Sequence, residues 1–351
     1  MQPDAHHALS PRLSANGGPA VKLSASQVSI CRRLRTLLSD GTLRMAGGGC
    51  PCGAQPQDRP VGELDRYGIP LRSVLCMDCG TLRFDPYLDE ESLQRFYRDY
   101  YQELYERSPD AKAYFATQEG YGARVLQALR RHVPDARTVV EVGCGAGGAL
   151  SVLQEAGIEV AGCDHSARLV KFGKSRGLRT LVLGGIEELQ SQNVDAAYLH
   201  HVFEHLADPV GFLLACKRML RPSGVVMLIV PDISRIHRFA FPGGDVRLFL
   251  HVAHKFNYSR LGLARLAARA GYALEPIGGF ESDKAPEMWL ALRPGGAPAA
   301  QQGAASEGEA MLQYLRRTEK LYRLGVLPGY GAGLLGRLGR LTATLGRMGA
   351  P

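Results

Sequence analysis

The middle of the chain alternates between short apolar runs and longer amphipathic stretches. Strands are expected at Thr138–Val142, Ile158–Cys163, Leu178–Leu183, Gly224–Val230, Tyr272–Ile277 and Met288–Leu292, with a further strand in VDAAYLHH. Helices are expected at Ala149–Ala156, Ala167–Arg176, Asp208–Leu220 and Arg260–Ala270. Apolar runs of a strand's length that alternate with helical patterns are typical of a parallel sheet. The pattern therefore predicts an α/β fold with a doubly wound sheet.

The segment TVVEVGCGAGGALSVLQEAGIEVAGCD carries the densest functional information. It predicts a strand, a tight glycine turn and a helix, followed by a second strand that ends at Asp164. That aspartate lies nineteen positions after Gly145. A carboxylate at the carboxyl end of such a strand can accept both hydroxyls of an adenosine ribose. The segment therefore indicates a ribose-bearing cofactor.

The glycines alone do not identify that cofactor. Gly143, Gly145 and Gly148 also satisfy G-x-G-x-x-G, the pattern that seats a dinucleotide pyrophosphate on a helix amino terminus. A nicotinamide-linked enzyme should show a second nucleotide-binding half, and no second glycine fingerprint follows the fourth strand. A hydride-transferring enzyme is therefore the less favoured reading.

Four motifs in order, EVGCGAGG, GCD, VDAAYLHHVFEHLADP and LRPSGVVMLIVP, resemble the motif series of class I S-adenosylmethionine-dependent methyltransferases. The resemblance covers roughly residues Arg124 to Pro294. It implies a Rossmann-like sheet of seven strands, the last antiparallel, and S-adenosyl-L-methionine as cofactor. The cofactor contacts that it indicates are Glu141, Gly143, Gly145, Gly147, Asp164, His165, Ile186 and His201.

The chemistry of this cofactor suits the loop. S-adenosylmethionine has no pyrophosphate, so the glycines need only allow close backbone approach to its methionine part. The amino terminus of the following helix favours the carboxylate of that part. Glu141 can receive its ammonium group, directly or through water. The alternative is that Glu141 is a capping or core-edge acid.

Candidate catalytic residues follow the fourth strand, in HHVFEHLADP. Glu204 and His205 fit as base and orienter, because imidazole titrates near neutrality and a neighbouring carboxylate can set its tautomer and raise its basicity. The same residues also read as a connection in which Asp208 caps a helix that begins at Pro209. His251 and His254 either face the acceptor or are polar loop residues.

Cys50, Cys52, Cys76 and Cys79 form a second module, CPCG followed by CMDCG. Paired cysteines at glycine turns are how a small ribbon holds zinc through four thiolates. The first pair is C-x-C, one residue shorter than the usual knuckle, and Cys31 or a polar group is the alternative ligand. Structural zinc is favoured over four unmetallated thiols.

The segment CMDCGTLRFDPYLDEESLQRFYRDYY resembles the cysteine ribbon and tyrosine-rich helix that precede the methyltransferase domain in a subset of these enzymes, which includes sugar C-methyltransferases. The resemblance implies a small-molecule acceptor such as a sugar nucleotide or a glycan or glycolipid precursor. A helix at Glu91–Tyr105 either presents Tyr97, Tyr100 or Tyr101 to the reacting groups as a lid or serves only as a docking helix.

Composition is that of a globular protein, with 351 residues, 45% hydrophobic and 22% charged. Residues 1–49 hold six Lys/Arg against two Asp/Glu, and residues 295–351 hold seven against three, so the ends account for the net charge of +8. Charge confined to the ends disfavours nucleic-acid binding. The amino terminus lacks the order of a secretory signal, and we expect a cytoplasmic protein.

Five segments are expected: a flexible segment at 1–45, the cysteine ribbon at 46–90, connecting helices at 91–123, the methyltransferase domain at 124–294, and a linker with a basic helical tail at 295–351. Leucines recur at helical spacing between residues 334 and 345 of that tail, and peripheral membrane contact is its less favoured role. Methyl transfer is the expected activity. A non-catalytic cofactor-binding scaffold is the main alternative.

Overall fold

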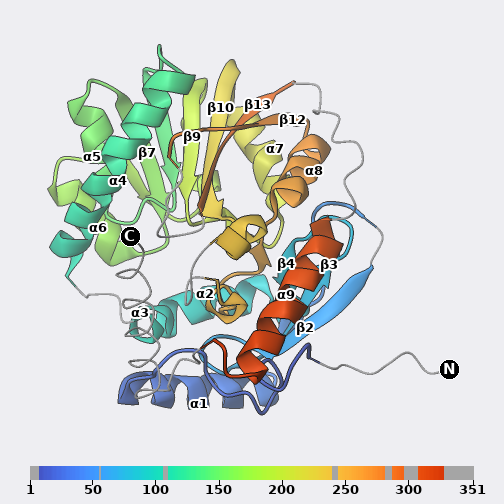
Figure 1. Cartoon of the computed structure of the whole chain (residues 1–351). Helices are drawn as coiled ribbons and strands as arrows, with labels where there is room; N and C mark the ends of the chain where they lie inside the picture. Colours follow the sequence, from blue (N-terminus) through green and yellow to red (C-terminus); the bar gives the residue numbers. More distant parts are fainter. Residues whose placement is uncertain are drawn as a thin grey trace, which may run out of the picture.

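The computed structural model describes residues 8–54, 57–105, 110–238, 244–280, 287–295 and 307–327. Figure 1 shows a large sheet between two layers of helices, with a smaller sheet and its helices below. The leucine-rich tail expected between residues 334 and 345 lies outside the described ranges. Among the helices within them, none combines the length and the apolar character needed to cross a lipid bilayer.

The large sheet has seven strands within the described residues: β6 (Thr138–Val142), β7 (Glu159–Asp164), β8 (Leu181–Leu183), β9 (Val194–His200), β10 (Leu220–Pro231), β12 (Tyr272–Pro276) and β13 (Glu287–Pro294). Their order is β12-β13-β10-β9-β6-β7-β8. The five from β6 to β10 run parallel, while β13 lies antiparallel to both of its neighbours. The predicted doubly wound sheet with an antiparallel last strand is confirmed.

Helices cover both faces of this sheet (Figure 1). One layer contains α4 (Ala111–His132), α5 (Gly148–Glu155) and α6 (Ala167–Ser175), and the other α7 (Pro209–Met219) and α8 (Arg260–Arg269). Along β10, Met227 and Ile229 belong to the first hydrophobic layer, whereas Val226 and Leu228 belong to the second. Alternate side chains of a strand point to opposite faces, so a continuous apolar run is needed to fill both layers.

The smaller sheet contains β2 (Asp58–Leu64), β3 (Pro70–Cys76), β4 (Leu82–Phe84) and β11 (Phe256–Asn257), in the order β11-β4-β3-β2. A two-stranded sheet lies beside it, with β1 (Met45–Ala46) and β5 (Tyr87–Leu88). Strand β11 comes from the segment between β10 and α8, and Phe256 pairs with Arg83 of β4. The two parts of the molecule are thus joined through a shared sheet.

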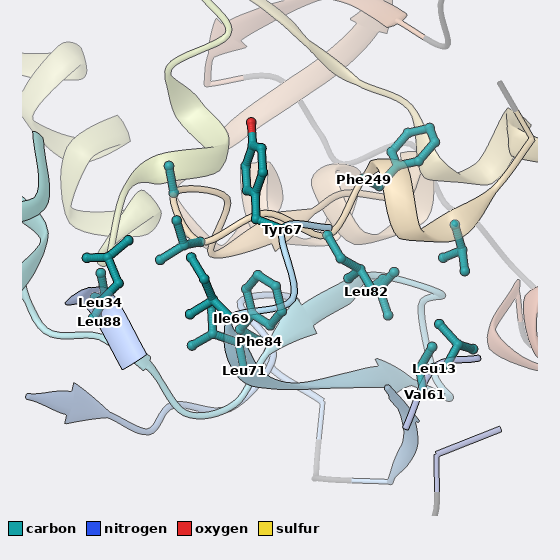
Figure 2. Close-up of a cluster of buried hydrophobic side chains, with 14 of the residues drawn as sticks. Leu13, Leu34, Val61, Tyr67, Ile69, Leu71, Leu82, Phe84, Leu88 and Phe249 are labelled. Atoms are coloured by element: carbon teal, nitrogen blue, oxygen red, sulfur yellow. The ribbon is translucent and has the colours of Figure 1, made fainter. Parts of the chain in front are cut away.

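The expectation of a flexible segment over residues 1–45 is corrected by helix α1 (Ala25–Ser39). A capping box between Ser24 and Gln27 begins the helix, and Leu34 on its inner face is 1% exposed. Figure 2 shows the cluster that it joins, with Leu34 from α1 and Phe84 from β4. Apolar residues at helical spacing form a stable helix when a packing partner exists, and the smaller sheet supplies one.

Two further expectations change in detail. The helix expected at Glu91–Tyr105 is divided at Tyr100 into α2 (Glu90–Asp99) and α3 (Tyr101–Leu104). Helix α9 (Glu307–Arg323) begins inside the expected linker. At Gly308 a β-carbon would lie 2.3 Å from the carbonyl oxygen of Met77, so this glycine permits close docking on the small sheet.

The two ends of the described chain are tied together. The guanidinium of Arg12 is hydrogen-bonded to Glu319 of α9 and, at 2.7 Å, to Asp245. Asp245 lies just before a 3₁₀ turn, η4 (Val246–Leu248), and its side chain is fully buried. Part of the basic charge of the ends is therefore used in a buried ion network, not left solvated.

We predict that Leu34→Ala lowers the free energy of unfolding by about 2–5 kcal/mol, because it opens a cavity in the cluster under α1. Urea denaturation measures the loss. The matched control is Arg32→Ala, on the exposed face of the same helix, which should change stability by under about 0.5 kcal/mol. Equal effects of the two substitutions would contradict the packed position of α1.

Candidate functional site

The turn between β6 and α5 has no room for a β-carbon at its glycine positions. Gly143, Gly145 and Gly147 have positive φ angles of 73°, 55° and 78°. A β-carbon on Gly143 would lie 2.4 Å from the Cγ2 atom of Val202, and one on Gly147 would lie 2.5 Å from the Cδ1 atom of Leu178. The backbone of this turn therefore lies close to Val202, which follows β9, and to Leu178, which precedes β8.

Gln118 of α4 supports this turn, and the sequence analysis missed it. Its amide oxygen accepts hydrogen bonds from the backbone N–H groups of Ala146 (3.1 Å) and Gly148 (3.3 Å), and its amide nitrogen donates to the carbonyl of Cys144 (2.8 Å). Gln118 is buried on the same helix face as Phe115. A polar residue on the buried face of a helix was the available signal.

Asp164 joins the glycine turn to the start of α6. Its carboxylate accepts hydrogen bonds from the N–H of Gly145 and the N–H of Ser166, each at 2.8 Å. His165, next to it, is exposed, and Ile186 is half-buried at the start of the 3₁₀ turn η1 (Ile186–Glu188) after β8. These residues lie at the carboxyl ends of neighbouring parallel strands, where the predicted cofactor site requires them.

Glu141 is a buried carboxyl group in the middle of the sheet. It is 3% exposed, and its Oε2 atom has no hydrogen-bond partner among the described residues. Burial raises the pKa of Glu141 to about 8, and the Tyr198 hydroxyl lowers it in part. A buried polar atom without a partner calls for an explanation, and a cationic group supplied from the glycine turn would satisfy it.

His201 lies between two carboxylates just after β9. Its Nδ1 atom is 3.2 Å from Oε1 of Glu204, and its Nε2 atom is 3.0 Å from Oε1 of Glu287. Burial disfavours the imidazolium, but the two carboxylates outweigh it and raise the pKa of His201 to about 9. Both ring nitrogens are thus engaged within the protein.

Glu204 and His205 form the 3₁₀ turn η2 (Phe203–His205), and their relation differs from the expected pair. The Nδ1 atom of His205 is 2.8 Å from the carbonyl oxygen of Ala253, so a backbone carbonyl, not Glu204, sets its tautomer. Glu204 is fully buried and faces His201 and His254, with Oε1 3.7 Å from Nε2 of His254. The sequence could not show that Ala253 would reach His205.

Tyrosine rings from α2 and α3 lie over these histidines. The Tyr97 ring is 6.1 Å from that of His205, and Tyr101 and Tyr105 continue the series with ring centroids 4.4 Å apart. The Tyr105 hydroxyl is hydrogen-bonded to Nδ1 of His251. Of the expected lid residues, Tyr97 and Tyr101 belong to this series, while Tyr100 forms the break between the two helices.

The four predicted metal ligands meet at one point. Cys50 Sγ lies 3.6 Å from Cys79 Sγ, and Cys52 Sγ lies 3.9 Å from Cys76 Sγ. All four sulfurs are buried, unbridged by disulfides and within 4.8 Å of one another. Cys31, the alternative ligand, lies in α1 within a different hydrophobic cluster. Thiolates bound tetrahedrally at about 2.3 Å from zinc lie about 3.8 Å apart, so the spacing suits zinc.

Residues 140–228 match the family model described as "Methyltransferase domain". The match contains the glycine turn, Asp164 and the turn with Glu204 and His205. This part of the chain is a class I S-adenosylmethionine-dependent methyltransferase domain, as the ordered motifs and the seven-stranded sheet indicated.

Curated proteins that are similar in sequence to this chain are also named as methyltransferases. A protein of Mycolicibacterium smegmatis named "Probable S-adenosylmethionine-dependent methyltransferase" is 31% identical over 40% of this chain and 53% of its own. A ubiquinone biosynthesis O-methyltransferase of Xanthomonas oryzae is 32% identical over 26% of this chain and 41% of its own length. The chain thus spans about half the length of the relatives it matches. A solved methyltransferase structure from Archaeoglobus fulgidus is 18% identical, with a TM-score of 0.38 over 51% of this chain and 97% of that one.

We predict that His201 stays protonated at neutral pH. Its pKa of about 9 lies above the ordinary value near 6.5, so its contribution to stability is fully present below about pH 6.5 and is lost as the pH rises through about 9. An NMR titration of the His201 ring measures this pKa. Glu287→Gln should lower it, whereas Glu275→Gln, an exposed control on β12, should leave it unchanged. A wild-type value near 6.5 would contradict the two-carboxylate arrangement.

Proposed function

We propose that this protein transfers the methyl group of S-adenosylmethionine to a small-molecule acceptor at the carboxyl edge of the large sheet. The observation that carries the proposal is the buried carboxyl of Glu141, whose Oε2 atom has no partner among the described residues, just before a turn with three positive-φ glycines. The matched methyltransferase domain supports it. A scaffold without turnover would have no use for a base placed beside that turn.

The residues fit this cofactor. Glu141 would hold the ammonium of the methionine part, and the backbone of Gly143, Gly145 and Gly147 would lie along it. Asp164 would accept the ribose hydroxyls, and its bonds to two backbone N–H groups orient its carboxylate for this. The adenine would lie beside Ile186 and His165. The ring face of His201 would contact the bound cofactor.

When bound, S-adenosylmethionine supplies an electrophilic methyl group on a positively charged sulfur. The protein must hold the acceptor in line with it and remove a proton where the acceptor begins protonated. His205 is placed for the second task, because donation from Nδ1 to Ala253 leaves the lone pair on Nε2. The buried charge of Glu204 would stabilise the His205 imidazolium once it has taken that proton.

An oxygen acceptor is favoured by several relatives that are named as ubiquinone biosynthesis O-methyltransferases. A sugar nucleotide or a glycan precursor is favoured by the resemblance of the cysteine ribbon and tyrosine-rich helix to those of sugar methyltransferases. The two readings are compatible, since a sugar hydroxyl is an oxygen acceptor. The Tyr97 ring near His205 would then cover the acceptor as a lid.

We also propose that the four clustered cysteines bind one structural zinc ion. The sulfur separations support this, and so does the burial of four thiols at a point with little apolar volume to fill. Zinc thiolates need reducing surroundings, and we therefore propose the cytoplasm as the compartment.

Calorimetric titration tests the cofactor. We predict micromolar binding of S-adenosylmethionine and no binding of NADH, with Asp164→Ala weakening the former at least tenfold by removing the ribose acceptor and freeing the turn. Asp135→Ala, exposed in the turn between α4 and β6, is the control. NADH binding in place of S-adenosylmethionine would overturn the proposal.

A second variant separates binding from turnover. His205→Asn keeps a donor near Ala253 but has no base, so the affinity for S-adenosylmethionine should stay within about twofold. Release of S-adenosylhomocysteine, followed against a panel of phenols and nucleotide-linked sugars, should fall by roughly 10²–10⁴. Full turnover in this variant would remove His205 from the chemistry, and cofactor binding without turnover in the wild type would favour a scaffold.

We predict about one zinc per chain by metal analysis of the purified protein. A strong chelator or Cys76→Ser should release it and lower the melting temperature, because structural zinc contributes directly to folding free energy. Cys216→Ser, a buried cysteine of α7 outside the cluster, controls for the loss of any buried thiol. Zinc-free protein with an unchanged melting temperature would refute the site.

A further inference from the structure

An open pocket of about 780 Å³ lies apart from the glycine turn, where the 3₁₀ segment η3 (Ile233–Arg238) and the first turn of α8 meet α9. Its wall includes Arg235, His237, Arg238, Arg260, Met311 and Tyr314. Segment η3 follows directly from the carboxyl end of β10. Pockets of this volume are typical of small-molecule sites.

The wall of the pocket is strongly basic. Arg235, Arg238 and Arg260 line it together with His237, against the single acidic side chain Glu307 among the described lining residues. Arg260 is paired at 3.1 Å with the fully buried Asp232 behind the wall, which holds its guanidinium in place. The net charge facing the pocket is therefore positive, and an anionic ligand fits it.

Arg235 is a half-buried part of this wall. Its Nε and Nη1 atoms are buried and have no hydrogen-bond partner among the described residues, so they do not face the open space of the pocket. The edge of a guanidinium that can hold two oxygens of a phosphate is formed by Nη2 together with Nε or with Nη1. Three arginines in one wall therefore provide the planar donor groups that suit a phosphate.

The apolar and aromatic residues of the pocket suit a flat ring. Met311 and Ala310 present apolar surface from α9, and the rings of Tyr314 and His237 lie 6.2 Å apart at 67°. Tyr314 is fixed by donation from its hydroxyl to the carbonyl of Gly244 at 2.9 Å. Rigid aromatic side chains at a pocket wall stack on ring systems of many kinds. An inorganic anion would leave this half of the pocket unused.

We propose that this pocket binds an organic diphosphate, with the phosphates on Arg235, Arg238 and Arg260 and the attached ring system against Tyr314, His237 and Met311. A nucleoside diphosphate has this chemistry. The proposal stands independently of methyl transfer, because none of these residues belongs to the cofactor seat or to the turn with His205.

The pocket nevertheless adjoins that turn through a short chain of contacts. Ser259 lines the pocket, and the ring of the preceding Tyr258 lies 5.6 Å from that of Phe203, two residues before His205. Tyr258 is fully buried, so one packed residue connects Ser259 at the pocket to the turn with His205.

Calorimetric titration of the full chain with UDP, GDP, inorganic pyrophosphate and uridine tests the proposal. We expect UDP or GDP to bind, pyrophosphate to bind at least tenfold more weakly, and uridine not to bind. Arg235→Gln and the rim variant Arg238→Gln should each weaken diphosphate binding roughly 10- to 100-fold. Arg317→Gln, exposed on α9 outside the pocket, should leave it unchanged.

Three possible results would contradict the proposal or part of it. Absence of nucleoside diphosphate binding in the wild type, or equal binding in Arg238→Gln and wild type, would overturn the proposal. Pyrophosphate binding as tightly as UDP and GDP would overturn the ring contact and reduce the pocket to an inorganic anion site. Titration of the same variants with S-adenosylmethionine distinguishes this result from failure of the proposed function, because Arg235→Gln should leave that affinity within about twofold.

Discussion

The close approach of the β6–α5 turn to its surroundings is the constraint on which the site depends. Gly145 would place a β-carbon 2.7 Å from the Tyr114 ring, and Gly148 would place one 2.1 Å from the carbonyl oxygen of Phe115. Any larger residue would push α4 away and break the Gln118 bonds that hold the turn. Because the turn packs so closely on α4, its backbone lies beside Glu141 and Asp164 at the carboxyl edge of the sheet, where the proposed cofactor would bind.

Burial and neighbouring charges together decide which side chains near this turn are ionised. Burial raises the pKa of Glu141 to about 8. Burial acts in the same direction on Glu204, but the histidines that face this carboxylate outweigh it and lower its pKa to about 2. His201 is charged because two carboxylates hold it. Two buried carboxyl groups, one in β6 and one in the turn after β9, thus have pKa values shifted in opposite directions, and that contrast is typical of residues with different tasks at a functional site.

The cysteine ribbon and the large sheet depend on each other. Strand β11 extends the ribbon sheet, and the same segment carries His254 and the carbonyl of Ala253 to the turn after β9. Helix α2 brings Tyr97 from the other side. Loss of the ribbon would therefore disturb the backbone group that orients His205, as well as the packing under α1.

The sequence by itself determined the doubly wound sheet, the glycine turn with Asp164 and the cysteine set, because each is a local pattern whose spacing carries its meaning. Only the tertiary structure showed that Gln118, Ala253 and Glu287 complete the site, since each acts through a contact between residues far apart in the chain. The packing of α1, and the arginine pocket at η3, were equally hidden. The apolar residues of α1 become a packed helix face only when the folded chain places the small sheet against them. The arginines, far apart in the sequence, form a pocket wall only when folding brings them together.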